Sequence, residues 1–167
     1  MNQPSLPDAE ELLASLTAQM RPHVTAQTGL VGIVTGGAWL AERLHRELKL
    51  EVSHGSLDVS FYRDDFQHKG LKHQITPSAI PFEVEGRDLI LVDDVLYTGR
   101  TIRAAMNELF DYGRPASIRL AALVDRGGRE LPIAAQFVGT MLALPAQYSI
   151  ELKRDAHGRL SLALQQP

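Results

Sequence analysis

The chain has 167 residues, of which 44% are hydrophobic and 22% charged. This balance is typical of one folded domain and excludes a disordered or fibrous chain. The absence of cysteine excludes thiol catalysis, thiolate metal sites and a disulfide framework. The net charge of -3 at pH 7 gives no sign of a nucleic-acid partner. No secretory signal or membrane-spanning apolar run is visible, so we expect a cytoplasmic protein without a membrane partner.

The first part of the chain alternates between helical and strand patterns. Apolar residues recur at helical spacing over residues 8–20, and Pro22 should end that helix. The continuous apolar run over 30–34 is typical of a buried strand in a parallel sheet. We then expect a tight turn over 35–37, followed by a helix that runs to about Leu50.

The middle of the chain contains a long polar stretch between two strand patterns. A strand is predicted over 57–63, and the polar residues 64–81 are expected to form a flexible lid. The apolar run over 89–92 predicts a central strand. A loop over 93–99 and a helix over 100–112 are expected to follow it.

The last part of the chain predicts two further strands and a hairpin. Residues 118–124 and 136–144 are rich in apolar side chains, and two short strand patterns flank a turn at 155–158. Alternating strands and helices predict an α/β fold with three layers and a mostly parallel central sheet. We expect a single domain over 1–167, in which residues 145–167 form the C-terminal hairpin.

Three segments rich in glycine or charge follow predicted strands of this sheet: residues 35–37, 93–99 and 125–128. Ligands of open α/β sheets bind beyond the carboxyl ends of the strands. Because those ends meet at one edge of a parallel sheet, we expect the three segments to form one ligand site.

The segment from Asp93 to Thr101 combines two chemistries. Asp93 and Asp94 are adjacent carboxylates whose like charges repel, a cost that hydroxyl groups or a cation would relieve. The N-terminus of the following helix offers unpaired backbone N–H groups, which suit a phosphate. Gly99 allows a ligand to approach the backbone closely. A sugar with vicinal hydroxyls and a phosphate fits both parts.

The same segment resembles the phosphoribosyl-diphosphate signature of type I phosphoribosyltransferases and, more narrowly, the PyrR family of pyrimidine operon regulators. The matching stretches are residues 92–101, 113–116 and 123–133, with further matches at 31–33 and 62–65. The resemblance covers about residues 30–139. It implies the three-layer type I phosphoribosyltransferase fold with a small hood.

The resemblance also implies a reaction, in which uracil and 5-phosphoribosyl diphosphate give UMP and diphosphate. It implies Mg²⁺, bound mainly through phosphoribosyl diphosphate, and no metal site made by the protein alone. Members of the family combine this activity with RNA-binding attenuation control, and they form dimers and higher assemblies, so a homo-oligomer (dimer or tetramer) is expected.

The roles implied by the resemblance fall on five groups of residues. They are the catalytic carboxylates and ribose ligands Asp93 and Asp94; the 5′-phosphate ligands Thr98, Gly99, Arg100 and Thr101; the diphosphate ligands Thr35, Gly36 and Gly37; the motif and base region Val95, Leu96, Tyr97, Asp125, Arg126 and Gly127; and the lid residues Arg63, Asp64 and Asp65. Relatives that act on purines carry an acid where this chain has Tyr97, which favours a pyrimidine base.

The chain departs from the family pattern at positions that carry charge. The diphosphate loop of the family reads Thr-Arg-Gly, but here Gly36 stands in place of the arginine. We expect weaker binding of the sugar donor, and unchanged or higher affinity after Gly36→Arg. The first helix has no basic residue before Arg21, and Gly128 and Ala134 replace a histidine and an arginine. These losses predict weak or no RNA binding.

Two alternatives stay open at this point. A regulator that binds UMP or RNA with little or no turnover would carry the same motifs. A flavodoxin-like phosphoacceptor domain also has paired acids after a strand, but it predicts neither a lid nor the helix start at Thr98–Thr101.

Overall fold

The computed structural model describes residues 3–60 and 78–166. Five strands form one sheet in the order β2-β1-β3-β4-β5, and every neighbouring pair is parallel. The strands are β1 (Gly29–Ile33), β2 (Gly55–Leu57), β3 (Asp88–Leu96), β4 (Ser117–Asp125) and β5 (Phe137–Met141). The predicted mostly parallel sheet is therefore confirmed.

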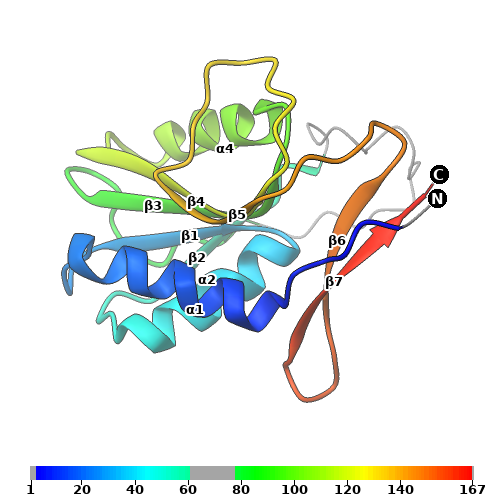
Figure 1. Ribbon diagram of the computed structural model, residues 1–167. Helices are drawn as coiled ribbons and strands as arrows, with labels where there is room; N and C mark the ends of the chain where they lie inside the picture. Colours follow the sequence, from blue (N-terminus) through cyan, green and yellow to red (C-terminus); the bar gives the residue numbers. More distant parts are fainter. Residues whose placement is uncertain (1–2, 61–77, 167) are drawn as a thin grey trace.

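Helices cover both faces of this sheet (Figure 1). On one face lie α1 (Ala9–Met20), which continues into the short 3-10 helix η1 (Arg21–His23), and α2 (Gly36–Leu48). On the other face lies α4 (Arg100–Asp111). Each face has its own apolar core, one around Leu16, Leu40 and Leu44 and the other around Leu91, Ile102 and Leu109. The three predicted layers are confirmed.

The first helix forms where its sequence predicts it. The side chain of Asp8 caps it by accepting hydrogen bonds from the backbone N–H groups of Glu10 (2.8 Å) and Glu11 (3.4 Å). Such a cap satisfies donors that the first turn otherwise leaves open. The buried side chains recur at helical spacing and face the sheet: Ala9, Leu12, Leu13, Leu16, Thr17 and Met20.

The hairpin of β6 (Ser149–Arg154) and β7 (Leu160–Gln165) lies beside the edge at which the strands of the sheet end (Figure 1). Leu152 and Leu160 are buried in the core under α1 and α2, so the hairpin is part of the packed structure. Its position fits the small hood that the family resemblance implies. Both ends of the described chain lie near it (Figure 1).

Three predicted boundaries are wrong. The strand predicted over 57–63 is β2 at Gly55–Leu57; residues 58–60 form no strand, and 61–63 lie outside the described residues. The turn predicted over 35–37 ends early, because Gly36 and Gly37 already belong to α2. The loop predicted over 93–99 begins only at Tyr97, because pairing with β4 continues to Leu96. This pairing overrides the low strand propensity of aspartate.

Candidate active site

The three predicted segments meet because β1, β3 and β4 are adjacent parallel strands that end at the same edge. Glycine permits the closest of these approaches. A Cβ atom on Gly37 would collide with the backbone oxygen of Val92, and a Cβ atom on Gly36 would collide with the carboxylate of Asp94. The first turn of α2 therefore lies directly against the end of β3, beside the paired acids.

The paired carboxylates are held in a buried position. Asp93 is 3% exposed and Asp94 8% exposed. Each carboxylate accepts a hydrogen bond from the next residue along the chain, Asp93 Oδ1 from the Asp94 N–H (2.9 Å) and Asp94 Oδ1 from the Val95 N–H (2.8 Å). These backbone donors fix the orientation of both carboxylates. The site thus offers two oriented acceptor groups where a ribose diol could bind.

The segment after β3 changes into the first turn of α4 at Gly99. This residue has a positive φ of 94°, which side-chain-bearing residues adopt rarely, and it is the N-cap of α4. The buried hydroxyl of Thr98 accepts a hydrogen bond from the Arg100 N–H (3.2 Å). Thr98, Gly99, Arg100 and Thr101 therefore lie together at the positive end of a helix, where an anion is stabilised.

Arg129 connects the loop that follows β4 to the segment between β3 and α4. Its guanidinium donates to the carbonyl oxygens of Tyr97 (2.8 Å) and Ile133 (2.8 Å) and to the carboxylate of Asp125 (2.6 Å). Burial alone would raise the pKa of Asp125, but the hydrogen bonds from Arg129 and the Gly127 N–H outweigh it and lower the pKa. Asp125 is therefore an ionised anchor for this loop.

Arg126 lies across the ring of Tyr97, with its guanidinium carbon 4.0 Å from the ring centroid. The residue is 8% exposed, and its buried Nε atom has no hydrogen-bond partner among residues 3–60 and 78–166. A desolvated cation–π contact contributes about 2 kcal/mol. The effective cost of burying an ion is several kcal/mol. The aromatic contact therefore offsets only part of the cost of burying this cation.

Gly128 lies against the edge of the Tyr97 ring. A Cβ atom there would collide with the ring, and the φ of this glycine is +80°. Tyr97 is thus confined between Arg126 and the backbone of Gly128, while Arg129 holds its carbonyl oxygen.

The structure brings most of the predicted site residues together. The described groups at 35–37, 93–101 and 125–127 converge at one edge of the sheet, whereas Arg63, Asp64 and Asp65 lie outside the described residues. Sequence reasoning missed Arg129 and Gly128 as contacts of Tyr97. The opposite charges of Asp125 and Arg129, four residues apart, were a signal for their ion pair. No local pattern linked Arg129 to the carbonyl group of Tyr97.

Comparisons with known proteins agree with this geometry. Residues 3–145 match the family model described as "Phosphoribosyl transferase domain". A "Bifunctional protein PyrR" of Pseudomonas aeruginosa is 54% identical over 153 residues, which cover 89% of each chain. Another of the same name, from Ralstonia nicotianae, is 52% identical over 155 residues, covering 90% of this chain and 88% of the relative.

Solved structures support the fold. A hypoxanthine-guanine phosphoribosyltransferase of Bacillus anthracis has a TM-score of 0.65 at 18% identity and covers 86% of this chain and 84% of that chain. A hypoxanthine phosphoribosyltransferase of Staphylococcus aureus has a TM-score of 0.66 at 22% identity and covers 89% of this chain and 81% of that chain.

These comparisons distinguish a phosphoribosyltransferase from a flavodoxin-like phosphoacceptor domain, which sheet topology alone does not. The strand order β2-β1-β3-β4-β5 also occurs in flavodoxin-like sheets, so topology alone does not exclude the phosphoacceptor alternative. The family match over most of the chain excludes it. Every helix within the described ranges is too short or too polar to cross a bilayer. The chain belongs to the phosphoribosyltransferase domain family and, within it, to the PyrR family.

Proposed function

We propose that this chain transfers the 5-phosphoribosyl group of phosphoribosyl diphosphate to uracil, which yields UMP and diphosphate. The observation that carries the proposal is the single edge at which two buried carboxylates, the N-terminus of α4 and the first turn of α2 meet. These three features match the diol, the 5′-phosphate and the diphosphate of the sugar donor. The high identity to proteins described as bifunctional PyrR supports it.

In this reaction the bond from C1′ to diphosphate breaks as a bond to N1 of uracil forms, and the N1 proton passes to the departing diphosphate or to solvent. Positive charge develops on the ribose in the transition state. Asp93 and Asp94 bind the ribose hydroxyls and stabilise that charge, since buried carboxylates act strongly in a site with little water. Thr98 to Thr101 hold the 5′-phosphate and so fix the position of C1′. No protein nucleophile is required.

The residues present fit a magnesium ion carried by the substrate. Within the described ranges, no group of three or more His, Asp or Glu residues could hold a metal ion by itself. Mg²⁺ commonly binds through one or two carboxylates together with substrate phosphates and waters, which suits Asp93 and Asp94. When bound, the ion would neutralise charge on the departing diphosphate.

The experiment is a magnesium-dependent assay of nucleotide formation with uracil and with hypoxanthine. We expect UMP to form and uracil to be preferred, because Tyr97 replaces the acid that purine-specific relatives carry at this position. Preference for hypoxanthine would contradict the assignment of the base. Tight UMP binding without turnover would favour the second candidate, a regulator that senses the nucleotide.

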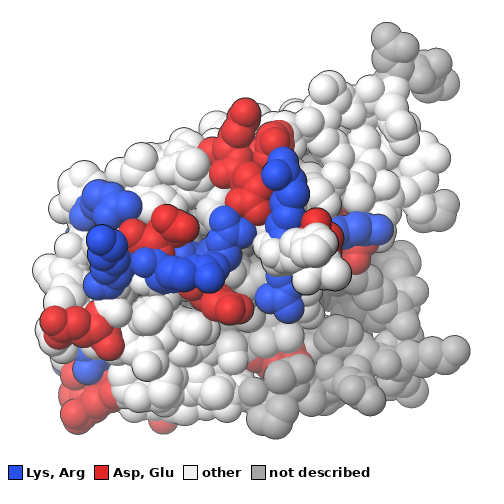
Figure 2. Space-filling model, turned by 90° about the horizontal axis from the view of Figure 1, so that it is seen from below, with Lys and Arg blue, Asp and Glu red and all other residues white. Residues whose placement is uncertain are grey.

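The regulatory candidate is favoured by the word bifunctional in the names of the relatives. The face that carries α1 and α2 shows Lys and Arg side chains interleaved with Asp and Glu (Figure 2). Alternating charges neutralise fewer phosphates than a continuous basic surface does. This arrangement supports the prediction of weak or no RNA binding. The homo-oligomer (dimer or tetramer) is a separate prediction.

Gly36→Arg is expected to lower kcat, whereas the family pattern predicts unchanged or higher affinity for the sugar donor. Any side chain at this position begins with a Cβ atom that collides with the carboxylate of Asp94. This collision displaces the Asp94 carboxylate, and because a displacement of about 1 Å can lower a rate about a hundredfold, we expect kcat to fall at least about tenfold. Steady-state kinetics of Gly36→Ala and Gly36→Arg separate the steric effect of the Cβ atom from the effect of the positive charge. Both variants add the Cβ atom, and only Gly36→Arg adds a cation. Unchanged kcat in Gly36→Ala would show that Asp94 moves aside without consequence.

A further inference from the structure

The turn at 35–37, which the proposed function assigns to the diphosphate, is joined to Trp39 by backbone hydrogen bonds. Thr35 is the N-cap of α2, and within residues 3–60 and 78–166 its side chain makes no capping hydrogen bond. Its carbonyl oxygen accepts hydrogen bonds from the N–H groups of Ala38 (3.2 Å) and Trp39 (3.3 Å). A contact that holds Trp39 in place therefore also holds this turn.

Arg154 makes such a contact from the hairpin. Its guanidinium carbon lies 4.7 Å from the centroid of the Trp39 ring, and its Nη1 atom lies 3.7 Å from Glu42 Oε2. Trp39 and Glu42 are three positions apart on α2, so their side chains lie on the same face of the helix. Arg154 thus connects the first two turns of α2 to a segment that is distant along the chain.

This connection crosses a cavity of about 630 Å³ between α2 and the hairpin. Trp39, Glu42 and Arg154 are among the residues that line it. Trp39 is partly buried against the core under α1 and α2, and Arg154 lies over its ring. Close-packed side chains resist a small displacement, whereas an open cavity does not. Arg154 therefore restrains the Trp39 ring where packing between α2 and the hairpin is incomplete.

The position of Arg154 is itself fixed by the hairpin. Leu152 precedes it by two residues on β6, and Leu160 is its partner on β7. Both leucines are buried in the core under α1 and α2. The Leu160 N–H also donates a hydrogen bond to the carboxylate of Glu10 (2.9 Å), which joins this end of the hairpin to α1.

The turn at 35–37 lies so close to the paired acids that its exact position matters. A Cβ atom on Gly36 would collide with the carboxylate of Asp94. Small errors in the position of a binding group have large effects on a reaction. We propose that Arg154 is a positioning residue that acts through Trp39 and holds this turn in the geometry that binds the diphosphate of the sugar donor. This proposal rests on the proposed function.

The first test is Arg154→Gln, which removes the cation and keeps a polar side chain. An exposed cation–π contact corresponds to about a two- to fivefold effect, and a desolvated contact to a larger one. Because Trp39 is half-buried, we expect the KM for phosphoribosyl diphosphate to rise about three- to tenfold. The KM for uracil should change less than about twofold. An unchanged KM for phosphoribosyl diphosphate, or equal rises in both constants, would overturn the proposal.

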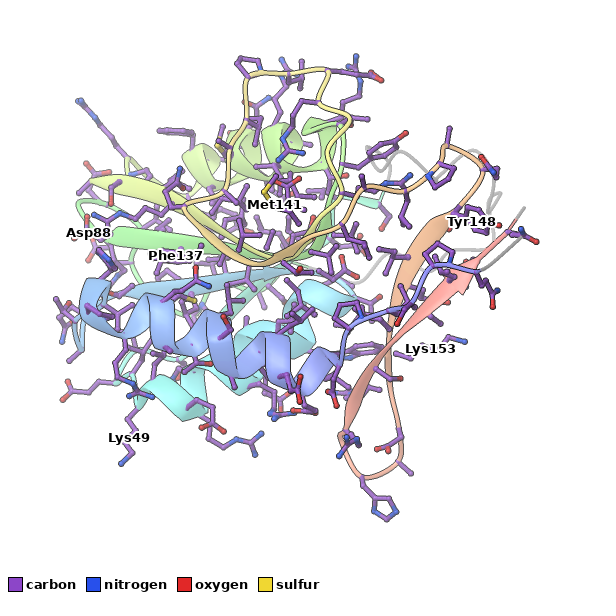
Figure 3. All side chains as sticks on the ribbon, in the orientation of Figure 1. Lys49, Asp88, Phe137, Met141, Tyr148 and Lys153 are labelled. Carbon is purple, nitrogen blue, oxygen red and sulfur yellow. The ribbon has the colours of Figure 1, made fainter. Side chains whose placement is uncertain are left out.

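Two further variants show whether the cation over the ring is responsible. Arg154→Lys keeps a cation and should return the KM for phosphoribosyl diphosphate to within about twofold of wild type. The matched control is Lys153→Gln on the neighbouring position of β6, since successive side chains of a strand point to opposite faces (Figure 3). Lys153 Nζ lies 4.0 Å from the carboxylate of Glu151 on the same strand. We expect no change in either KM for this variant; a rise like that of Arg154→Gln would reflect net charge alone and overturn the proposal.

A double-mutant cycle tests whether Arg154 acts through Trp39. Trp39→Leu keeps an apolar side chain at the edge of the core and removes the aromatic ring. Arg154→Gln should then change the KM for phosphoribosyl diphosphate by less than about twofold in the Trp39→Leu background, because the contact is already lost. The same rise in both backgrounds would show that Arg154 acts by another route and would overturn the proposal.

A binding measurement separates this proposal from the proposed function. Phosphoribosyl diphosphate and UMP share the ribose 5-phosphate, and only the first carries a diphosphate. Calorimetry in the presence of Mg²⁺ should show that Arg154→Gln weakens the binding of phosphoribosyl diphosphate but not that of UMP. Equal weakening of both ligands, or of neither, would overturn the inference. This readout does not depend on turnover, so absence of UMP formation by the wild-type protein would contradict the proposed function alone.

Discussion

Asp94→Asn is expected to lower the kcat for UMP formation by about a hundredfold or more. Removal of one preorganised group that stabilises transition-state charge has effects of about 10²–10³ in other enzymes. Asparagine keeps an oxygen that can accept the hydrogen bond from the Val95 N–H, so the local backbone should be preserved. The variant therefore removes charge at the ribose with little change of shape. The measurement is kcat at saturating uracil and phosphoribosyl diphosphate.

Asp88→Asn is the matched control for this experiment. Asp88 is the first residue of β3, lies at the end of the strand opposite to Asp94, and is exposed (Figure 3). Its carboxylate accepts a hydrogen bond from the Ser117 hydroxyl (2.6 Å), a contact that an amide oxygen can also make. We expect kcat within about twofold of wild type. Similar losses of activity in both variants would mean that the effect of Asp94→Asn is not specific to the site.

The largest expected effect on stability comes from Glu10→Gln. The Glu10 carboxylate accepts hydrogen bonds from Arg43 Nη1 (3.1 Å), Arg43 Nη2 (2.8 Å) and the Leu160 N–H (2.9 Å). This one side chain thus joins α1, α2 and the hairpin. Both partners are 24% exposed and line a cavity of about 630 Å³, so water screens the pair in part.

The expected decrease in the free energy of unfolding lies between the decreases that follow the loss of an exposed and of a buried ion pair. Exposed pairs contribute about 0–1 kcal/mol, while breaking a buried pair costs about 3–5 kcal/mol. We expect Glu10→Gln to lower the free energy of unfolding by about 1.5 kcal/mol, which corresponds to a decrease in Tm of about 3–6 °C for a chain of this size. The measurement is thermal unfolding at neutral pH. The matched control is Glu42→Gln, which breaks the exposed pair of Glu42 with Arg154 (3.7 Å) and should change stability by less than about 0.5 kcal/mol.

The contribution of Glu10 should also depend on pH. The hydrogen bond from Arg43 is the main cause that lowers the pKa of this carboxyl, and the Leu160 N–H adds to it. A carboxyl with a lowered pKa in the folded state contributes stability above its unfolded pKa of about 4.3. That contribution disappears as the pH falls through the folded pKa. The difference in Tm between wild type and Glu10→Gln should therefore be largest near neutrality and shrink below about pH 4.3; a constant difference down to pH 3 would contradict this assignment.

The sequence alone was sufficient for most of the helices and strands, and it predicted which segments the fold brings together at one edge of the sheet. Apolar periodicity predicted the helix at 8–20 and the strand at 30–34, which the structure contains as α1 and β1. The segment from Asp93 to Thr101 indicated a phosphorylated sugar through its residue types and their order along the chain. The predicted helices and strands are confirmed because burial patterns depend on neighbouring residues, whereas the phosphorylated sugar stays a prediction.

Tertiary structure decided the contacts between segments that are distant along the chain. It extended β3 to Leu96 through pairing with β4, and it placed Gly36 against the carboxylate of Asp94. It also buried Arg126 on the ring of Tyr97 and joined Arg129 to a carbonyl group 32 residues away. Composition and spacing do not encode such partners, because hydrogen bonds and close packing depend on which surfaces the whole chain brings together in space.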